Sequence, residues 1–439
     1  MISNENKRLA QWAMNYALRN GCSAARVAIN TGSNTSFELR DARMDRLQQA
    51  SESRMTLFLF VDGRFGTFST NRLNRRELER FITNGIDSTR YLAVDEARTL
   101  PDPSRFFRGG KPDLQLLDPN FHSVNPDDKV RMAEVVAEEI LGTDDRIISI
   151  QSTYSDGDSF SYQITSNGFE GETKSSSYSL SASVSVRGEG EARPSSFWFD
   201  SALFLNNLNR DGIGKRALER ALQKIGQQKI ASGRYTMVLD SLNSGRLLQP
   251  VIGATFGSAL QQRNSFLLDK LGEKVGSDKL TLTDNPHIIG ASGARYFDNE
   301  GVATENRVVF DKGVLKTYYI DTFNANRMQV EPTIANPSIL NMQTGNKDLH
   351  GLIADINNGI YVTGFNGGNT NSSTGNFSFG VEGFLIQNGN LVTPISEMNI
   401  TGNMITLWNS LAETGNDPML NRSWRIPSLV FENVDFSGL

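Results

Sequence analysis

A segment in which apolar residues alternate with serine constrains the fold more than any other part of the sequence. From Ser177 to Val186, every even-numbered position is apolar and every odd-numbered position is serine. Successive side chains of a β-strand point to opposite faces, so a period of two predicts a strand with one buried and one wet face. Strands of a parallel sheet are usually apolar on both faces. The segment therefore predicts an antiparallel sheet that is covered on one side.

Helices are predicted on both sides of this strand region. Apolar residues recur at helical spacing around residues 9–17, 75–87 and 213–225, and a further helix is expected to begin at Asp127 or Asp128 and to run to about Ile140. Short strands are expected at Val27–Ile29 and Thr35–Leu39, with a stronger one at Met55–Val61 that turns at Asp62-Gly63. Helices and strands do not alternate regularly, so the sequence predicts an α+β fold.

The sequence divides into three expected domains. Prolines and glycines concentrate between residues 100 and 125, which indicates a boundary. We expect an N-terminal α/β unit at 1–100, a middle α+β domain with an antiparallel meander at 115–230, and a β-rich C-terminal domain at 231–439. The last domain is mostly strand and turn, with turns at Asp311-Lys312-Gly313 and Asn388-Gly389-Asn390 and a short helix near Met404.

One longer helix is predicted in the C-terminal domain, from Leu247 to Leu260. Its apolar residues form a packing stripe, so the helix is expected to lie in the core. Pro250 must lie near the first turn or kink the helix, because it donates no backbone N–H. Gly253 and Gly257 would let another backbone approach closely.

Charge and composition exclude several classes of protein. The net charge is −5 and no run of five like charges occurs, whereas a nucleic-acid-binding surface needs a basic stripe. No stretch approaches the roughly 20 apolar residues that span a bilayer, and the N-terminus lacks the apolar core of a signal peptide. Cys22 is the only cysteine, so no intramolecular disulfide can form, and it is expected to be buried. We therefore expect a cytoplasmic protein that contacts neither nucleic acid nor membrane.

A loop rich in glycine and asparagine, at residues 364–376, is the candidate binding segment. It lacks the lysine and the following helix of a phosphate-binding P-loop. It is either a mobile surface loop or one wall of a peptide groove, where amides offer hydrogen bonds to an extended chain. On the groove interpretation the candidate substrate-binding residues are Gly367, Gly368, Asn369, Asn371, Gly375 and Asn376.

Five ordered segments of the second half resemble the TldD/PmbA family, the modulators of DNA gyrase, which comprises paired cytoplasmic metallopeptidase subunits. Each segment is weak evidence alone, but their order is specific. The resemblance covers most of residues 20–439 and is carried by Ser265–Gly272, Tyr296–Thr304, Lys312–Tyr319, Gly375–Phe384 with Asn388-Gly389, and Ile400–Met404 with Gly415-Asn416-Asp417.

The resemblance also implies that this chain binds no metal. In the zinc-bearing TldD subunit, the position of the predicted 247–260 helix carries His-Glu-x-x-x-His, and the matching residues here are Gln249, Pro250 and Ala254. An amide, a proline ring and a methyl group cannot hold zinc or deprotonate water. The family's additional cysteine ligand is also missing, because no cysteine follows Cys22. We therefore expect no catalytic residue and no cofactor in this chain, and zinc only in a TldD-like partner.

The remaining histidines do not suggest another metal site. His122, His287 and His350 are far apart in the sequence, and each lies in a polar, loop-like stretch. We interpret them as surface or capping residues.

The leading hypothesis is a metal-free subunit of the PmbA/TldE type. With a zinc-bearing TldD-like subunit it would process or degrade unfolded peptides in the cytoplasm, and the family links it to gyrase inhibitors. The alternative is a non-catalytic homodimeric module that binds peptides or regulates another protein. An independent hydrolase is the third and weakest interpretation.

Overall fold

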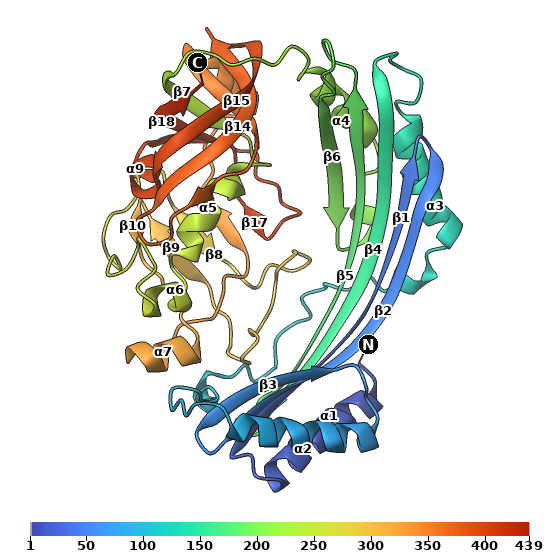
Figure 1. The fold of residues 1–439 in the computed structure, drawn as a ribbon, viewed down its shortest axis with the longest axis vertical. Coiled ribbons are helices and arrows are strands. Elements are labelled where there is room, and N and C mark those ends of the chain that lie inside the picture. Colours follow the sequence, from blue (N-terminus) through green and yellow to red (C-terminus); the bar gives the residue numbers. More distant parts are fainter. Residues whose placement is uncertain (1, 439) are drawn as a thin grey trace.

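The computed structural model describes residues 2–438, which form a mixed α+β protein. The N-terminal half builds one antiparallel sheet of long curved strands, and the C-terminal half builds two further sheets that lie to one side of it (Figure 1). The predicted α+β class is confirmed. The six-stranded sheet has the order β3 (Arg64–Thr70), β2 (Arg43–Val61), β1 (Ala24–Arg40), β4 (Ile147–Thr165), β5 (Glu170–Val186) and β6 (Ser195–Ala202).

The alternating segment forms the end of β5, and its apolar residues are buried as predicted. Tyr178 and Val186 are no more than 1% exposed, and they pack under α3 (Pro126–Glu138) and α4 (Ile213–Leu222). The serines between them point to the other face. The predicted half-covered antiparallel sheet is therefore confirmed.

All four helices of the N-terminal half cover the same face of this sheet. Along β1, the buried residues Val27 and Phe37 lie an even number of positions apart and so share a face. Val27 packs in the cluster with α1 (Asn4–Arg19) and α2 (Arg75–Arg90), whereas Phe37 packs in the cluster with α3. The opposite face is left for the C-terminal half.

The expected short strands at Val27–Ile29 and Thr35–Leu39 are wrong as separate elements, because β1 runs through both. Its polar middle pairs with β2 on one side and β4 on the other, and these ladders override the low strand propensity of the residues. Gly32 is required there, because a Cβ at this position would lie 2.6 Å from the carbonyl oxygen of Asp158.

The predicted start of the third helix is also corrected. Its N-cap is Asn125, whose side chain accepts a hydrogen bond from the N–H of Asp127, and Pro126 occupies the first turn. Asp127 and Asp128, either of which was expected to be the cap, lie inside the helix instead and complement its dipole.

The expected boundary at residues 100–125 is packed against the rest of the protein. Phe106 pairs with Val302, and the N–H of Gly290 donates to the carbonyl of Leu114 at 2.7 Å. Strands β1 and β4 lie on either side of this segment in the sequence but pair directly in one sheet. The described chain adds single turns of 3₁₀ helix at Pro103–Arg105, Phe121–Ser123 and Leu205–Asn207.

The C-terminal half contains a sheet that closes on itself. Strand β12 pairs with both β7 and β14, which completes a ring through β15 and β18. The strands of this sheet are β7 (Gly233–Leu239), β12 (Asn358–Phe365), β13 (Asn369–Thr370), β14 (Asn376–Gln387), β15 (Asn390–Asn403), β16 (Leu411–Thr414) and β18 (Leu429–Ser437).

A five-stranded sheet lies beside this ring. It is formed by β10 (Val314–Leu315), β9 (Arg307–Asp311), β8 (Leu282–Asp284), β11 (Leu340–Met342) and β17 (Trp424–Arg425). The predicted turns after Asp311 and at Asn388-Gly389 are present with the positive φ angles that such turns need. The short helix near Met404 is α9 (Met404–Asn409), while α7 (Thr322–Met328) and α8 (Leu349–Ala354) were not expected.

The single helix predicted from Leu247 to Leu260 is two helices, α5 (Ser244–Gly253) and α6 (Gly257–Gln261). The backbone between them pairs with Tyr319, which accepts from the N–H of Gly257 at 2.7 Å and donates to Thr255 at 3.0 Å. This tertiary contact interrupts the helix. A Cβ at Gly257 would lie 3.2 Å from Cα of Ile320, so the expected close approach is confirmed there, whereas Gly253 has no neighbour within 4 Å.

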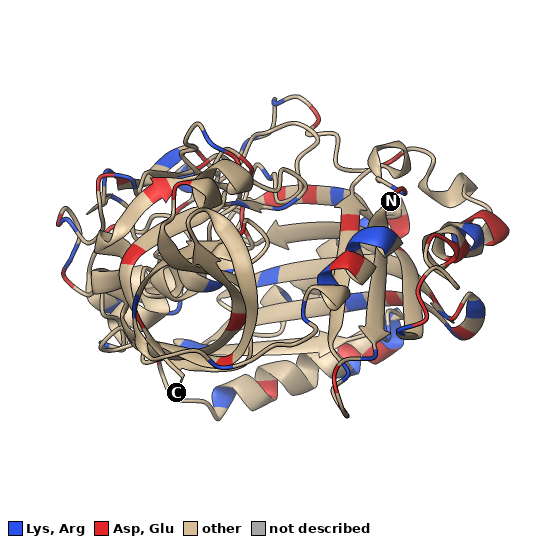
Figure 2. Ribbon diagram, turned by 90° about the horizontal axis from the view of Figure 1, so that it is seen from above, with Lys and Arg blue, Asp and Glu red and all other residues tan. Residues whose placement is uncertain are grey.

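Charges of both signs are interspersed on the helices and loops (Figure 2). Among residues 2–438, no helix combines the length and the apolar character needed to cross a bilayer.

Candidate functional site

Helix α5 is anchored at its start and along one face. The N–H of Asn243 donates to the carboxylate of Asp240 at 3.0 Å, and the Ser244 hydroxyl donates to the carbonyl of Pro427 at 2.8 Å. Its apolar residues Leu247, Leu248, Val251 and Ile252 are buried in the main core of the C-terminal half. The same helical period leaves Arg246, Gln249, Pro250 and Gly253 on the outer face.

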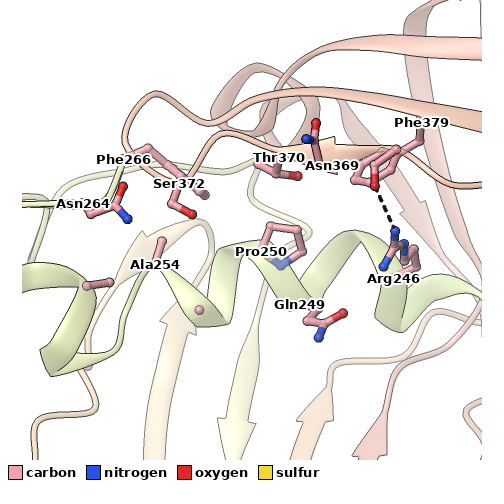
Figure 3. Close-up of a pocket in the computed structure, with 13 residues that line it drawn as sticks. Arg246, Gln249, Pro250, Ala254, Asn264, Phe266, Asn369, Thr370, Ser372 and Phe379 are labelled. Atoms are coloured by element: carbon pink, nitrogen blue, oxygen red, sulfur yellow. Dashed lines mark hydrogen bonds between the residues drawn. The ribbon is translucent and has the colours of Figure 1, made fainter.

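This outer face forms one wall of a pocket of about 380 Å³. The opposite wall comes from the 364–376 loop, with Gly368, Asn369, Thr370 and Ser372, and from Phe379 of β14 (Figure 3). The segment after α6 supplies Asn264 and Phe266. Helix α5 and the candidate peptide loop therefore meet in one pocket.

The polar side chains of the pocket are one guanidinium and several amides and hydroxyls, which can both donate and accept hydrogen bonds. Arg246 is exposed, donates weakly from Nη2 to the carbonyl of Gly368 at 3.4 Å, and lies over the ring of Phe379 at 5.2 Å (Figure 3). The Oγ1 atom of Thr370 is buried and has no hydrogen-bond partner. Pro250 and Phe266 provide apolar surface between these groups. The pocket lining thus combines polar side chains with apolar surface.

The residues around this pocket do not fit a zinc ion. None of the lining residues is a histidine, cysteine, aspartate or glutamate, the usual protein ligands of zinc. Gln249 is exposed and its amide points away from the loop, whereas Ala254 is only 3% exposed (Figure 3). Across residues 2–438, no group of three such side chains is placed to hold a metal.

Two of the six candidate loop residues line the pocket, namely Gly368 and Asn369. Gly367 lies beside them in the turn but outside the lining. Asn371 stabilises the loop itself, because its side-chain oxygen accepts from the N–H groups of Ser373 and Thr374.

The other two candidate residues lie at the base of the loop. Gly375 packs against the ring of Phe266 with a positive φ, and the side chain of Asn376 accepts from Asn403 at 3.0 Å. These contacts indicate that Gly375 and Asn376 hold the loop in its conformation.

Sequence reasoning missed the cationic residue of the pocket. Arg246 lies one helical turn before Gln249 and Pro250, so the helical period could have placed it on the same face. Asn264, Phe266 and Phe379 carry no comparable local signal, because they reach the pocket only through the tertiary fold.

The three histidines lie apart in separate surroundings, as expected. The His122 side chain is 74% exposed and lies 3.3 Å from the carboxylate of Asp158. His287 contacts the Thr304 hydroxyl at 3.0 Å, and burial lowers its pKa. His350 is exposed but lies on helix α8, so its expected place in a loop is wrong.

Comparison with known proteins identifies the family. Three family models match the chain in order: PmbA/TldA metallopeptidase domain 1 at residues 25–88, the central domain at 119–225 and the C-terminal domain at 232–438. The chain belongs to the PmbA/TldD metallopeptidase family.

Individual relatives agree with this assignment. Metalloprotease PmbA of Escherichia coli O157:H7 is 24% identical over 422 residues, which cover 94% of this chain and 92% of that protein. The crystal structure of a proposed modulator of DNA gyrase from Bacteroides thetaiotaomicron VPI-5482 is 68% identical, with a TM-score of 0.99 and full coverage of both chains. TldE from Thermococcus kodakarensis shares the fold, with a TM-score of 0.84 at 19% identity over 98% of this chain and 100% of that one.

Proposed function

We propose that this chain is the metal-free, PmbA/TldE-like subunit of a cytoplasmic TldD/TldE-type metallopeptidase complex that processes or degrades peptides. The observation that carries the proposal is the pocket between α5 and the 364–376 loop. It lies at the family's metal-motif position, and its lining supplies no histidine, thiolate or carboxylate. Polarising the scissile carbonyl and activating water would therefore belong to the zinc of a TldD-like partner.

The pocket suits one wall of a site for unfolded peptide. Arg246 and the unpartnered Thr370 hydroxyl can donate hydrogen bonds to peptide carbonyls. Pro250, Phe266 and Phe379 can cover apolar side chains of the same peptide. Neither group demands a particular peptide sequence, which is consistent with a subunit that positions peptides of varied sequence.

The same family link suggests how such a complex would affect DNA gyrase. Degradation of a peptide toxin or antitoxin directed at gyrase would change gyrase activity without any contact between this chain and DNA. The mixed signs of charge on the helices and loops (Figure 2) give no support to direct DNA binding.

The test is co-purification of this chain with a His-Glu-x-x-x-His protein from its native cell, followed by peptide hydrolysis by the purified pair. The informative variant is Gly253→Leu, because Gly253 lines the pocket and a Cβ there meets no atom within 4 Å. The larger side chain should fill the pocket and slow hydrolysis at least about tenfold, since both copurified subunits remain folded while peptide is excluded.

Ser258→Leu is the matched control, because Ser258 is exposed on the neighbouring helix α6 and does not line the pocket. It should hydrolyse peptides at the wild-type rate. Recovery of only a homodimer with no zinc-bearing partner would favour the non-catalytic alternative. Equal rates for the two leucine variants would contradict the role of the pocket.

A further inference from the structure

A second and larger cavity, of about 800 Å³, lies between the wet face of the long sheet and loops of the C-terminal half. The sheet contributes residues from β1, β2, β4 and β5, and the loops contribute residues near 292–299 and 337–338. It shares no lining residue with the pocket at α5. It is therefore a separate site.

Three sheet residues in this cavity are neighbours through the strand register. Arg26 on β1 pairs directly with Phe58 on β2, and its guanidinium lies 3.6 Å from the centre of that ring. Gln163 on β4 pairs with Ala28, two residues along β1 from Arg26, so Gln163 and Arg26 are diagonal neighbours on one face. The small side chain of Ala28 leaves space beside them.

Two nitrogens of these side chains are buried and have no hydrogen-bond acceptor, namely Nε of Arg26 and Nε2 of Gln163. Gln163 is only 7% exposed, so its amide is almost entirely removed from bulk water. A buried donor without an acceptor destabilises the fold, and the large majority of buried polar groups in native proteins have a partner. Two side chains that line the cavity thus carry unsatisfied donors.

The hydrogen bond of the Arg26 side chain leaves one edge of its guanidinium free. Nη1 donates to the carbonyl of Asn299 at 2.8 Å, and within residues 2–438 this side chain makes no other hydrogen bond and no ion pair. The Nε and Nη2 groups therefore remain as a parallel pair of donors. This edge matches the two oxygens of a carboxylate.

The nearby acidic residues do not occupy this edge. Asp298 accepts from the backbone N–H groups of Glu300 and Val302, and Glu300 accepts from the N–H and hydroxyl of Thr322. Burial lowers the pKa of Arg26, and the charges of Glu300 and Asp298 oppose that shift. The charged form of Arg26 is therefore disfavoured by burial, and the negative charges of Glu300 and Asp298 offset only part of this effect.

We infer that this cavity is a binding site for a carboxylate, held by the Nε–Nη2 edge of Arg26 and by the amide of Gln163. The ring of Phe58 fixes the guanidinium plane, because the cation stacks on its face. The rest of the ligand would lie against the hydroxyl groups of the wet face, such as those of Thr56, Ser161 and Ser175. The site does not depend on the metal-free role proposed above.

The carboxylate could come from a peptide C-terminus or from an acidic side chain, and calorimetric titration of the full chain distinguishes them. The probes are N-acetyl-alanyl-alanine, its C-terminal amide, and N-acetylglutamic acid α-amide, whose only carboxylate is on the side chain. The free acid should bind at least about tenfold more tightly than the neutral amide, because charge-assisted bidentate bonds are roughly twice as strong as neutral ones. The third probe shows whether a side-chain carboxylate suffices.

Variants assign the binding to the two residues. Arg26→Lys keeps the positive charge but removes the planar guanidinium that can donate two parallel hydrogen bonds to a carboxylate. It should weaken binding of the preferred acid about tenfold or more. Gln163→Glu places a second carboxylate beside the ligand and should abolish binding by repulsion. Lys174→Met is the matched control, because Lys174 lines the same cavity but its Nζ is paired with Asp113 at 2.8 Å. It should change affinity less than about threefold.

Several outcomes would overturn the inference. Absence of heat up to millimolar probe would show that the cavity binds no carboxylate. Equal affinity for acid and amide would contradict recognition of the carboxylate, and equal losses in the Arg26 and Lys174 variants would contradict the role of Arg26. Circular dichroism and thermal midpoints identify a variant that fails to fold, in which case Gln163→Glu or Arg26→Lys alone decides the question. Gly253→Leu should leave carboxylate binding unchanged, so failure of this site and failure of the proposed function remain distinguishable.

Discussion

The hydroxyl of Tyr361 donates to the carboxylate of Asp240 at 3.2 Å, and this bond fixes strand β12 against the turn that begins α5. Both residues are buried, at 8% and 5% exposure. Asp240 also accepts from the N–H of Asn243, and its own carbonyl accepts from the Ser244 hydroxyl at 2.7 Å. Burial raises the pKa of Asp240, and the charge of Arg220 opposes that rise. The position of the pocket wall therefore depends on a buried polar pair.

Removing this hydrogen bond should destabilise the protein. Tyr361→Phe leaves the buried carboxylate of Asp240 with one donor fewer, which should lower the free energy of unfolding by about 1–3 kcal/mol. Urea denaturation at pH 7 measures the change. Tyr91→Phe is the control, because Tyr91 is 91% exposed, and it should change stability by less than about 0.5 kcal/mol. Equal effects of the two variants would show that the bond contributes nothing.

The isolated chain should be free of metal and inactive on peptides. This expectation follows from Gln249, Pro250 and Ala254 and from a pocket lining without zinc ligands. Elemental analysis after mild chelation and a peptide-cleavage assay measure both properties. Near-stoichiometric zinc, or cleavage by the pure chain that a chelator abolishes, would refute the prediction.

Restoring the family motif should not create a peptidase. The variant combines Gln249→His, Pro250→Glu and Ala254→His. Two histidines five residues apart lie about 140° apart on a regular helix, and Gln249 points away from the loop that Ala254 faces (Figure 3). Ala254 is 3% exposed, so an imidazole there must displace core atoms. Peptide hydrolysis with added zinc is the measurement, and turnover comparable to that of zinc-bearing relatives would contradict our interpretation.

The only cysteine should be unreactive until the chain unfolds. Cys22 is 6% exposed, and burial raises the pKa of its thiol from about 9 to about 11. The native state holds the proton more tightly than the unfolded chain. This contribution to stability is therefore full below pH 9 and is lost as the pH rises toward 11.

A thiol reagent tests the Cys22 prediction at pH 8, where modification should follow the rate of unfolding. Between pH 9 and 11, Cys22→Ala should lose less stability than the wild type, because its side chain has no proton to release. Rapid modification of the native protein, or identical pH profiles of stability for the two proteins, would argue against it.

Local periodicity determined much of the fold. The serine alternation from Ser177 to Val186 predicted the half-covered sheet, because side-chain direction along a strand is a local property. The turn at Asp62-Gly63 could also be predicted from the sequence, because hairpin turns with positive φ angles favour aspartate and glycine. A helix from Leu247 to Leu260 was predicted, but its division into α5 and α6 was not, because the backbone of Tyr319 interrupts it.

The α+β class and the buried stripe of α5 could both be predicted from residue identity and short-range spacing, because the direction of a side chain in a helix or strand is a local property. Arg246 and Asn369 are far apart in the chain, and that they line the same pocket follows from the folded arrangement alone. The same holds for Arg26 and Gln163, which share one cavity through the pairing of β1 with β4. Strand register and loop packing follow from the burial of the whole core, and no local pattern records them.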